Sequence, residues 1–122
     1  MAAASCIELV SARLLQTNSG FANVMRAARD MKVSLVTLCT GSLDAANMWH
    51  AHPENGSKEA WAGLREELDF VLSLADEFNL VLGIKPEPGN VIADAVLARK
   101  VLNEVESNRL GIILDAANLL PH

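Results

Sequence analysis

The chain has 122 residues, of which 51% are hydrophobic and 20% charged, and its formal net charge is −5. This length and apolar fraction predict a single folded domain over residues 1–122 and exclude disorder. No apolar run approaches the ~20 residues that a membrane span needs. The acidic balance argues against a nucleic-acid partner, because phosphate backbones select clustered Lys and Arg.

The N-terminus carries no basic leader, since the first charged residue is Glu8. The two cysteines, Cys6 and Cys39, have no CxxC spacing and indicate no disulfide framework. These features predict a cytoplasmic protein with no membrane partner, in which both cysteines are free thiols.

Three short apolar runs lack polar alternation, as is typical of strands covered on both faces. Helical patterns precede and separate these runs. The expected order is helix over about 1–15, helix over 21–31, strand over 33–40, helix over 57–78, strand over 80–84, helix over 92–105 and strand over 110–114. Such alternation predicts an α/β fold of parallel βα units, either in a doubly wound open sheet or in part of a (β/α) barrel.

Polar residues mark where two of these helices begin. Ser57 fits an N-cap position, and Glu59 lies in the first turn, where the helix dipole favours a negative charge. Asn90 or Asp94 would start the helix over 92–105. Both architectures place ligand chemistry at the carboxyl ends of the strands.

The segment after the first apolar run, residues 40–55, is long for a connection between a strand and a helix, and such loops are usually functional. It carries Trp49, His50 and His52 near a strand end. The loop is either a lid that contacts a substrate or a segment beneath which Trp49 packs as an anchor. A His-x-His pair on a loop is a weak metal signal, so we expect histidines that are not ligands.

Two further polar segments follow the other apolar runs. Lys85 and Glu87 flank Pro86 directly after a buried strand, so they form either a binding site or a simple ion pair at the rim. A lysine at such a position can also act as a Schiff-base amine. Asp115 ends the last run and is either a helix cap or a ligand or base in a pocket.

Five blocks, taken together, resemble the sugar phosphate isomerase/epimerase family, which has the xylose-isomerase-like TIM barrel. They are VTLCTGS, NMWHAHPEN, AW, LGIKPEPGNV and LGIILDAANLL. The resemblance begins near residue 13 and is strongest over 33–120. A barrel of this kind has eight strands and about 250 residues. The resemblance therefore implies a partial (β/α)8 TIM barrel, about half of the whole, whose clear strands lie near its fourth, fifth and sixth.

The resemblance also implies a site. Family members hold a divalent metal (Mn, Mg, Co or Zn) at the carboxyl end of the barrel and move a proton between adjacent carbons of a sugar or sugar phosphate. Asp115 matches a metal ligand, whereas Lys85 stands where the family has a glutamate that binds metal and transfers protons. A lysine cation cannot ligate a hard metal as a carboxylate does. Lys85 and Glu87 are the implied catalytic positions. The implied substrate contacts are Trp49, His52, Asn90 and Asn118.

Three hypotheses follow. The first is a sugar phosphate isomerase/epimerase-like protein that is inactive as a partial barrel with Lys85 in place of a metal ligand. The second is a non-catalytic βα fragment that acts as a packing or assembly module and self-associates through exposed sheet edges. The third is aldolase-like chemistry at Lys85.

Overall fold

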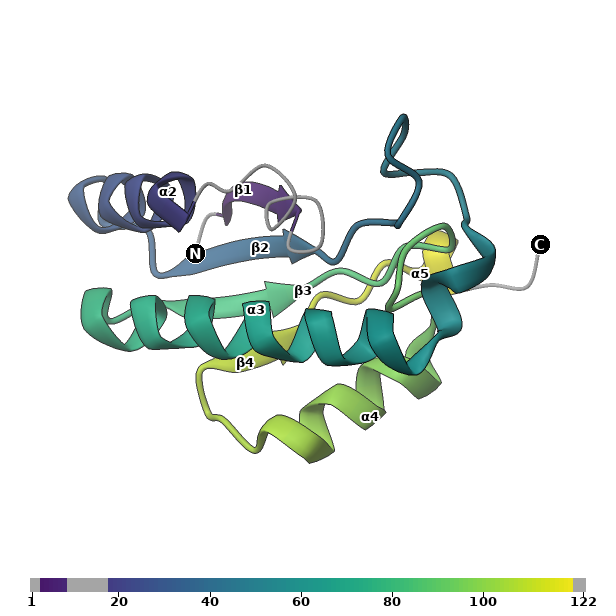
Figure 1. Ribbon diagram of the computed structural model, residues 1–122. Coiled ribbons are helices and arrows are strands. Elements are labelled where there is room, and N and C mark those ends of the chain that lie inside the picture. Colours follow the sequence, from purple (N-terminus) through teal and green to yellow (C-terminus); the bar gives the residue numbers. More distant parts are fainter. Residues whose placement is uncertain (1–2, 9–17, 120–122) are drawn as a thin grey trace.

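The computed structural model describes residues 3–8 and 18–119, which form one parallel sheet with helices packed against it (Figure 1). The elements in chain order are β1 (Ala3–Glu8), α2 (Asn18–Asp30), β2 (Leu35–Cys39), the 3-10 helix η1 (Pro53–Gly56), α3 (Lys58–Phe78), β3 (Val81–Ile84), α4 (Ala95–Val105), β4 (Leu110–Ile112) and α5 (Ala116–Leu119).

The strand order decides between the two predicted architectures. The sheet has the order β1-β2-β3-β4, and each strand pairs in parallel with the next one in the chain. A doubly wound sheet reverses its order at a switch point and carries helices on both faces, whereas a barrel adds strands in sequence and keeps its helices outside. The sequential order is that of a barrel segment and confirms the predicted α/β fold.

One face of the sheet forms the core. Alternate residues of β2 and β3 point to this face and are fully buried, namely Val36, Leu38, Leu82 and Ile84. They pack in one cluster with apolar residues of three helices, among them Met25 of α2, Leu64, Leu68 and Val71 of α3, and Val101 of α4. The helical periodicity predicted for these segments is thus explained by burial against the sheet.

The ladder continues past the strand ends and aligns the residues that follow. The backbone N–H of Lys85 donates to the carbonyl of Leu38 at 2.8 Å, and that of Ile113 donates to the carbonyl of Ile84 at 2.8 Å. The carboxyl ends of β2, β3 and β4 therefore lie at the same end of the sheet, where the connecting loops and α5 gather (Figure 1).

Side-chain caps fix the helix starts. The Ser57 hydroxyl accepts from the backbone N–H of Ala60 at 3.0 Å, as predicted. At α4 the cap is Asp94, whose carboxylate accepts from the N–H of Leu97 at 2.9 Å. Of the two predicted candidates for this start, Asp94 is confirmed and Asn90 is not the cap.

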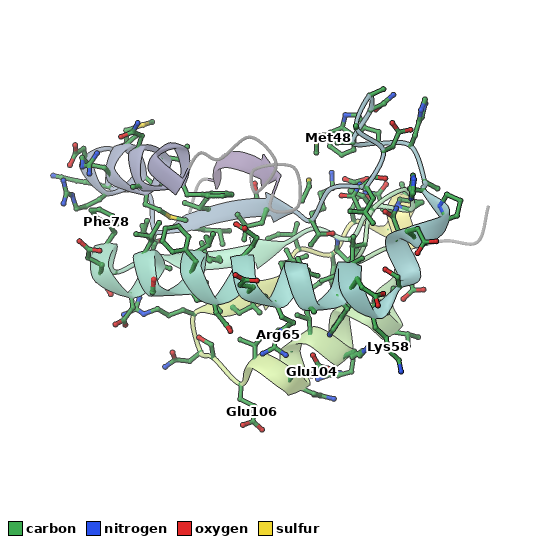
Figure 2. The ribbon with its side chains drawn as sticks, in the orientation of Figure 1. Met48, Lys58, Arg65, Phe78, Glu104 and Glu106 are labelled. Atoms are coloured by element: carbon green, nitrogen blue, oxygen red, sulfur yellow. The ribbon has the colours of Figure 1, made fainter. Side chains whose placement is uncertain are left out.

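Helices α3 and α4 are joined by a polar cluster on the outer surface. The Glu104 carboxylate accepts from the Arg65 guanidinium at 2.7 Å and from the Trp61 indole N–H at 2.8 Å. The side chains of Arg65 and Glu104 lie close together between the two helices in Figure 2. Hydrogen bonds from Trp61 and Arg65 lower the pKa of the Glu104 carboxyl below its ordinary value.

Arg109 stabilises the opposite end of the sheet, where the strands begin. Its guanidinium donates to Asp76 Oδ1 at 3.0 Å, to the carbonyl of Leu80 at 3.0 Å and to Asn79 Oδ1 at 3.2 Å. Arg109 immediately precedes β4, and its partners lie at the end of α3 and just before β3. One side chain thus fixes three elements at this end.

Two sequence predictions near the N-terminus are wrong. Residues 3–8 form strand β1 rather than a helix, because pairing along β2 outweighs the weak helical pattern of this segment. The rest of that predicted helix, residues 9–15, lies outside the described residues. Cys39 is disulfide-bonded rather than a free thiol, since β1 places a strand beside it, with Glu8 as its register partner. The side chain of Cys6 is not among those described.

Candidate functional site

An open pocket of about 540 Å³ lies at the carboxyl ends of β2, β3 and β4. Its walls are formed by Thr37, Cys39, Trp49, Lys85, Glu87, Ile113, Leu114, Asp115 and Ala116. Four of the predicted site residues, Trp49, Lys85, Glu87 and Asp115, therefore meet in one cavity. Pockets at this end of the strands are where barrel enzymes bind their ligands.

Lys85 lies between two carboxylates. Its Nζ is 3.4 Å from Glu87 Oε1 and 3.3 Å from Asp115 Oδ2. Glu87 lies two residues further along the chain than Lys85, and Asp115 follows the neighbouring strand β4. The Glu87 side chain is 15% exposed, whereas those of Lys85 and Asp115 are 36% and 37% exposed. The predicted ion pair at the rim is thus a three-residue cluster inside a pocket.

The electrostatics of this cluster favour a charged lysine. Hydrogen bonds with Asp115 and then with Glu87 raise the pKa of the Lys85 ammonium above its ordinary value. A Schiff-base lysine needs the opposite direction, since only the neutral amine attacks a carbonyl. The cluster therefore disfavours the aldolase-like hypothesis for Lys85.

Asp115 takes one of the two roles that its position predicted, that of a cap, while its role as a ligand or base stays a prediction. Its Oδ1 accepts from the backbone N–H of Ala117 at 3.1 Å, at the start of α5. Its Oδ2 faces Lys85 across the pocket. The capping bond fixes the carboxylate at the strand end and leaves one oxygen to pair with Lys85.

The loop between β2 and η1 presents Trp49 to the pocket. Trp49 is 53% exposed, so the alternative in which it packs beneath the loop as an anchor is wrong. The neighbouring Met48 marks the same protruding segment in Figure 2. The loop is held by polar side chains from elsewhere in the chain, which leaves the Trp49 indole free to contact a ligand.

Asn90 is the first of these loop anchors. It is 3% exposed, its Oδ1 accepts from the backbone N–H of Gly41 at 3.0 Å, and its Nδ2 donates to the carbonyl of Met48 at 2.8 Å. Asn90 does not line the pocket. These contacts make it a residue that positions the loop, while direct substrate binding by Asn90 stays a prediction.

Asn55 is a second anchor, which the sequence analysis did not single out. Its Oδ1 accepts from the N–H of Leu43 at 2.9 Å, and its Nδ2 donates to the carbonyl of Gly89 at 2.9 Å. A Cβ atom at Gly89 would overlap the carbonyl oxygen of Trp49, so the two loops touch directly. The only sequence signal for Asn55 was its place in the turn-like segment PENG.

His52 and Asn118 lie outside the lining of the pocket. His52 Nδ1 accepts from the backbone N–H of Glu54 at 3.1 Å, so its imidazole begins η1. Asn118 Nδ2 donates to the carbonyl of Pro86 at 3.2 Å, which joins α5 to the segment that carries Glu87. Both contacts are structural, and the substrate roles implied for these residues stay predictions.

The inner face of the sheet supplies two wall residues, Thr37 and Cys39, that no sequence motif indicated as site residues. Thr37 and Cys39 alternate along β2 with the buried Val36 and Leu38, and this period of two is the signal that could have found them. On the same face, a Cβ atom at Gly83 would lie 2.6 Å from Cδ1 of Ile113. The absence of a side chain at Gly83 therefore lets Ile113 cover the sheet beside the pocket.

The residues present do not fit the divalent metal that the resemblance implied. The described residues contain no group of three or more His, Cys, Asp or Glu side chains able to hold a metal. Between the two pocket carboxylates stands the Lys85 ammonium, which repels a cation. No chemical step of this site is therefore assigned to a metal.

Comparisons with known proteins agree with the fold. A family model described as xylose isomerase-like TIM barrel matches residues 12–121. A crystal structure of the IOLI protein with a binding zinc atom superposes with a TM-score of 0.71 at 12% identity, over 95% of this chain and 41% of that one. The chain thus spans less than half of that protein, and at this identity the likeness shows the fold alone. A comparison with curated proteins gave no match. The family model covers most of the chain, which therefore belongs to the xylose isomerase-like TIM barrel family.

Proposed function

We propose that this chain supplies part of the ligand-binding mouth of an isomerase or epimerase that acts on a sugar or sugar phosphate. The observation that supports the proposal is the pocket at the carboxyl ends of the strands, where an exposed indole faces a cluster of one ammonium and two carboxylates. Family membership supports the location of the site, because barrels bind their ligands at this end.

The side chains of the pocket suit a polyhydroxylated ligand. The exposed face of Trp49 can stack against the C–H face of a sugar ring. Lys85 can donate hydrogen bonds to the hydroxyl groups of the sugar, and Glu87 can accept hydrogen bonds from them. The cluster has one more negative charge than positive charge. We therefore expect neutral hydroxyl groups to contact it, with any phosphate of the ligand directed away from Asp115 and Glu87.

The same residues can move a proton between adjacent carbons. The Glu87 carboxylate would remove a proton from the carbon next to the carbonyl group and return it to the carbonyl carbon, while the hydroxyl proton passes to the former carbonyl oxygen, so that the carbonyl and hydroxyl groups exchange places. The Lys85 ammonium, 3.4 Å from Glu87, would stabilise the negative charge that develops on the neighbouring oxygen. Because the chain spans less than half of the solved structure that it resembles, we expect this chain by itself to bind the sugar with little or no turnover.

Binding is tested by 1H–15N NMR of the two tryptophan indoles during titration with neutral aldoses, ketoses and their phosphates. The Trp49 signal should shift, whereas Trp61, whose indole N–H is bound to Glu104, is the internal control. The variant Glu87→Gln should weaken binding, because it removes a charged acceptor. No shift at Trp49 with any sugar, or equal shifts at both indoles, would contradict the proposal.

Proton transfer is tested separately by incubating the chain with each sugar in D2O and following loss of the C–H signal. Slow exchange that Glu87→Gln abolishes would support Glu87 as the base. Exchange that continues unchanged in this variant would refute that role, while leaving the binding result as measured.

The open sheet edges favour a second candidate, an assembly module. Among the described strands, β1 and β4 each pair on one side, and the 79% exposed Leu114 follows β4. Unpaired strand edges are templates for pairing with another chain. Sedimentation equilibrium discriminates the two: a monomer that binds sugar supports the first candidate, and a dimer that does not bind sugar supports the second.

A further inference from the structure

Three of the four oxygen atoms of the pocket carboxylates are already engaged by the chain itself. Asp115 Oδ1 accepts from the N–H of Ala117, and Asp115 Oδ2 lies 3.3 Å from Lys85 Nζ. Glu87 Oε1 lies 3.4 Å from the same nitrogen. A cation that entered from solvent would have to displace Lys85 and then face its ammonium at close range.

Among the described residues, the rest of the pocket wall provides no imidazole, free thiol or further carboxylate as a ligand. Cys39 lines the pocket but is disulfide-bonded, so it cannot serve as a thiolate. Zinc sites use three or four protein ligands, and magnesium or calcium sites need several oxygens. The lysine, in contrast, is covalently part of the same segment as Glu87, so it is always present at high effective concentration.

We propose that the Lys85 ammonium is the permanent cation of this pocket, held between Glu87 and Asp115 where a divalent metal would have to bind, so that the site works without a metal. Lys85 thus fixes the two carboxylates and offers a proton donor to the ligand. This inference stands independently of the sugar, because it concerns the binding of metal to the chain alone.

Isothermal titration of the metal-free chain with MnCl2 and ZnCl2 tests the proposal. The wild-type chain should give no saturable binding, and Mn2+ should not selectively broaden the amide NMR signals of residues 85–87 and 113–116. Lys85→Glu replaces the ammonium by a third carboxylate and should bind metal at least roughly tenfold more tightly than the wild type. Its melting temperature should rise when metal is added.

Two further variants separate this explanation from general charge effects. Lys58→Glu makes the same change of charge at an exposed position of the first turn of α3 and should not create a metal site. Lys85→Gln removes the cation without adding a carboxylate and should bind metal less tightly than Lys85→Glu. Circular dichroism confirms that each variant is folded.

The proposal is overturned if the wild-type chain binds one Mn2+ or Zn2+ with selective broadening at these residues. It is equally overturned if Lys85→Glu folds but binds metal no more tightly than Lys58→Glu. The NMR titration of the wild-type chain decides the matter even if Lys85→Glu does not fold. Neither measurement uses a sugar, so sugar binding can fail or succeed without changing the outcome.

Discussion

Replacement of Asn90 by alanine tests whether this residue holds the loop or binds the ligand. The substitution removes two hydrogen bonds, one from the N–H of Gly41 and one to the carbonyl of Met48. Gly41 is buried, so its N–H would lose its partner away from water, at a cost of about 1–3 kcal/mol. The carbonyl of Met48 can be rehydrated, which limits that loss to about 0.5–1.5 kcal/mol.

The expected decrease in the free energy of unfolding is therefore about 1.5–4.5 kcal/mol, measured by urea denaturation followed by circular dichroism. Asn118→Ala is the matched control, because it removes one partly buried bond at 3.2 Å and should cost less than about 1 kcal/mol. The reasoning is refuted if Asn90→Ala is as stable as the control. Weaker sugar binding with unchanged stability would instead assign Asn90 to the ligand.

Three further substitutions test the loop contact, the outer polar cluster and the core. Gly89→Ala forces the carbonyl of Trp49 to move, so we expect a loss of about 1–3 kcal/mol and a shifted Trp49 indole signal in NMR spectra; an unchanged signal would contradict the contact. Glu104→Gln should lower stability by a constant amount above pH 4.5, and the difference should disappear as the pH falls through the lowered pKa of Glu104 in the folded state, because protonated Glu104 in the wild type is then as uncharged as the glutamine. Thermal melts across this pH range check the sign, and a difference that persists in acid would be inconsistent with it. Leu68→Ala should cost about 3–5 kcal/mol in urea denaturation, because the side chain is fully buried, whereas Val96→Ala at a 76% exposed position should cost little; similar losses in the two variants would contradict the described core.

The sequence was sufficient to predict β2, β3 and β4 because each is a short apolar run, and the core-facing residues of β2 and β3 are fully buried. The apolar runs that form β2, β3 and β4 contain few polar residues. Because these runs alternate with helices, the sequence was compatible with a doubly wound sheet or a barrel segment. Strand β1 was missed because AASCIE has little β-propensity of its own and is a strand through its pairing with β2. The local sequence pattern of a segment does not show which strand it will pair with.

The candidate site was predictable to the extent that it follows strand ends. Lys85 and Asp115 meet because residues after neighbouring parallel strands share one edge. The directions of side chains in loops were not predictable in the same way. Asn90 and His52 both lie in loops near the pocket, yet their side-chain polar atoms form hydrogen bonds with backbone groups of the loops. Sequence shows which residues a loop carries but not which atoms its backbone leaves unsatisfied.

The contacts of Arg109 stabilise the fold at a place that is separate from the residues that would select a ligand. They hold α3, β3 and β4 together through partners near residues 76–80, at the end of the sheet remote from the loops that surround Lys85. Mutations that reshape those loops leave these contacts untouched. Substitutions around Trp49 can therefore change which ligand the pocket prefers, while the contacts of Arg109 keep the strands in register.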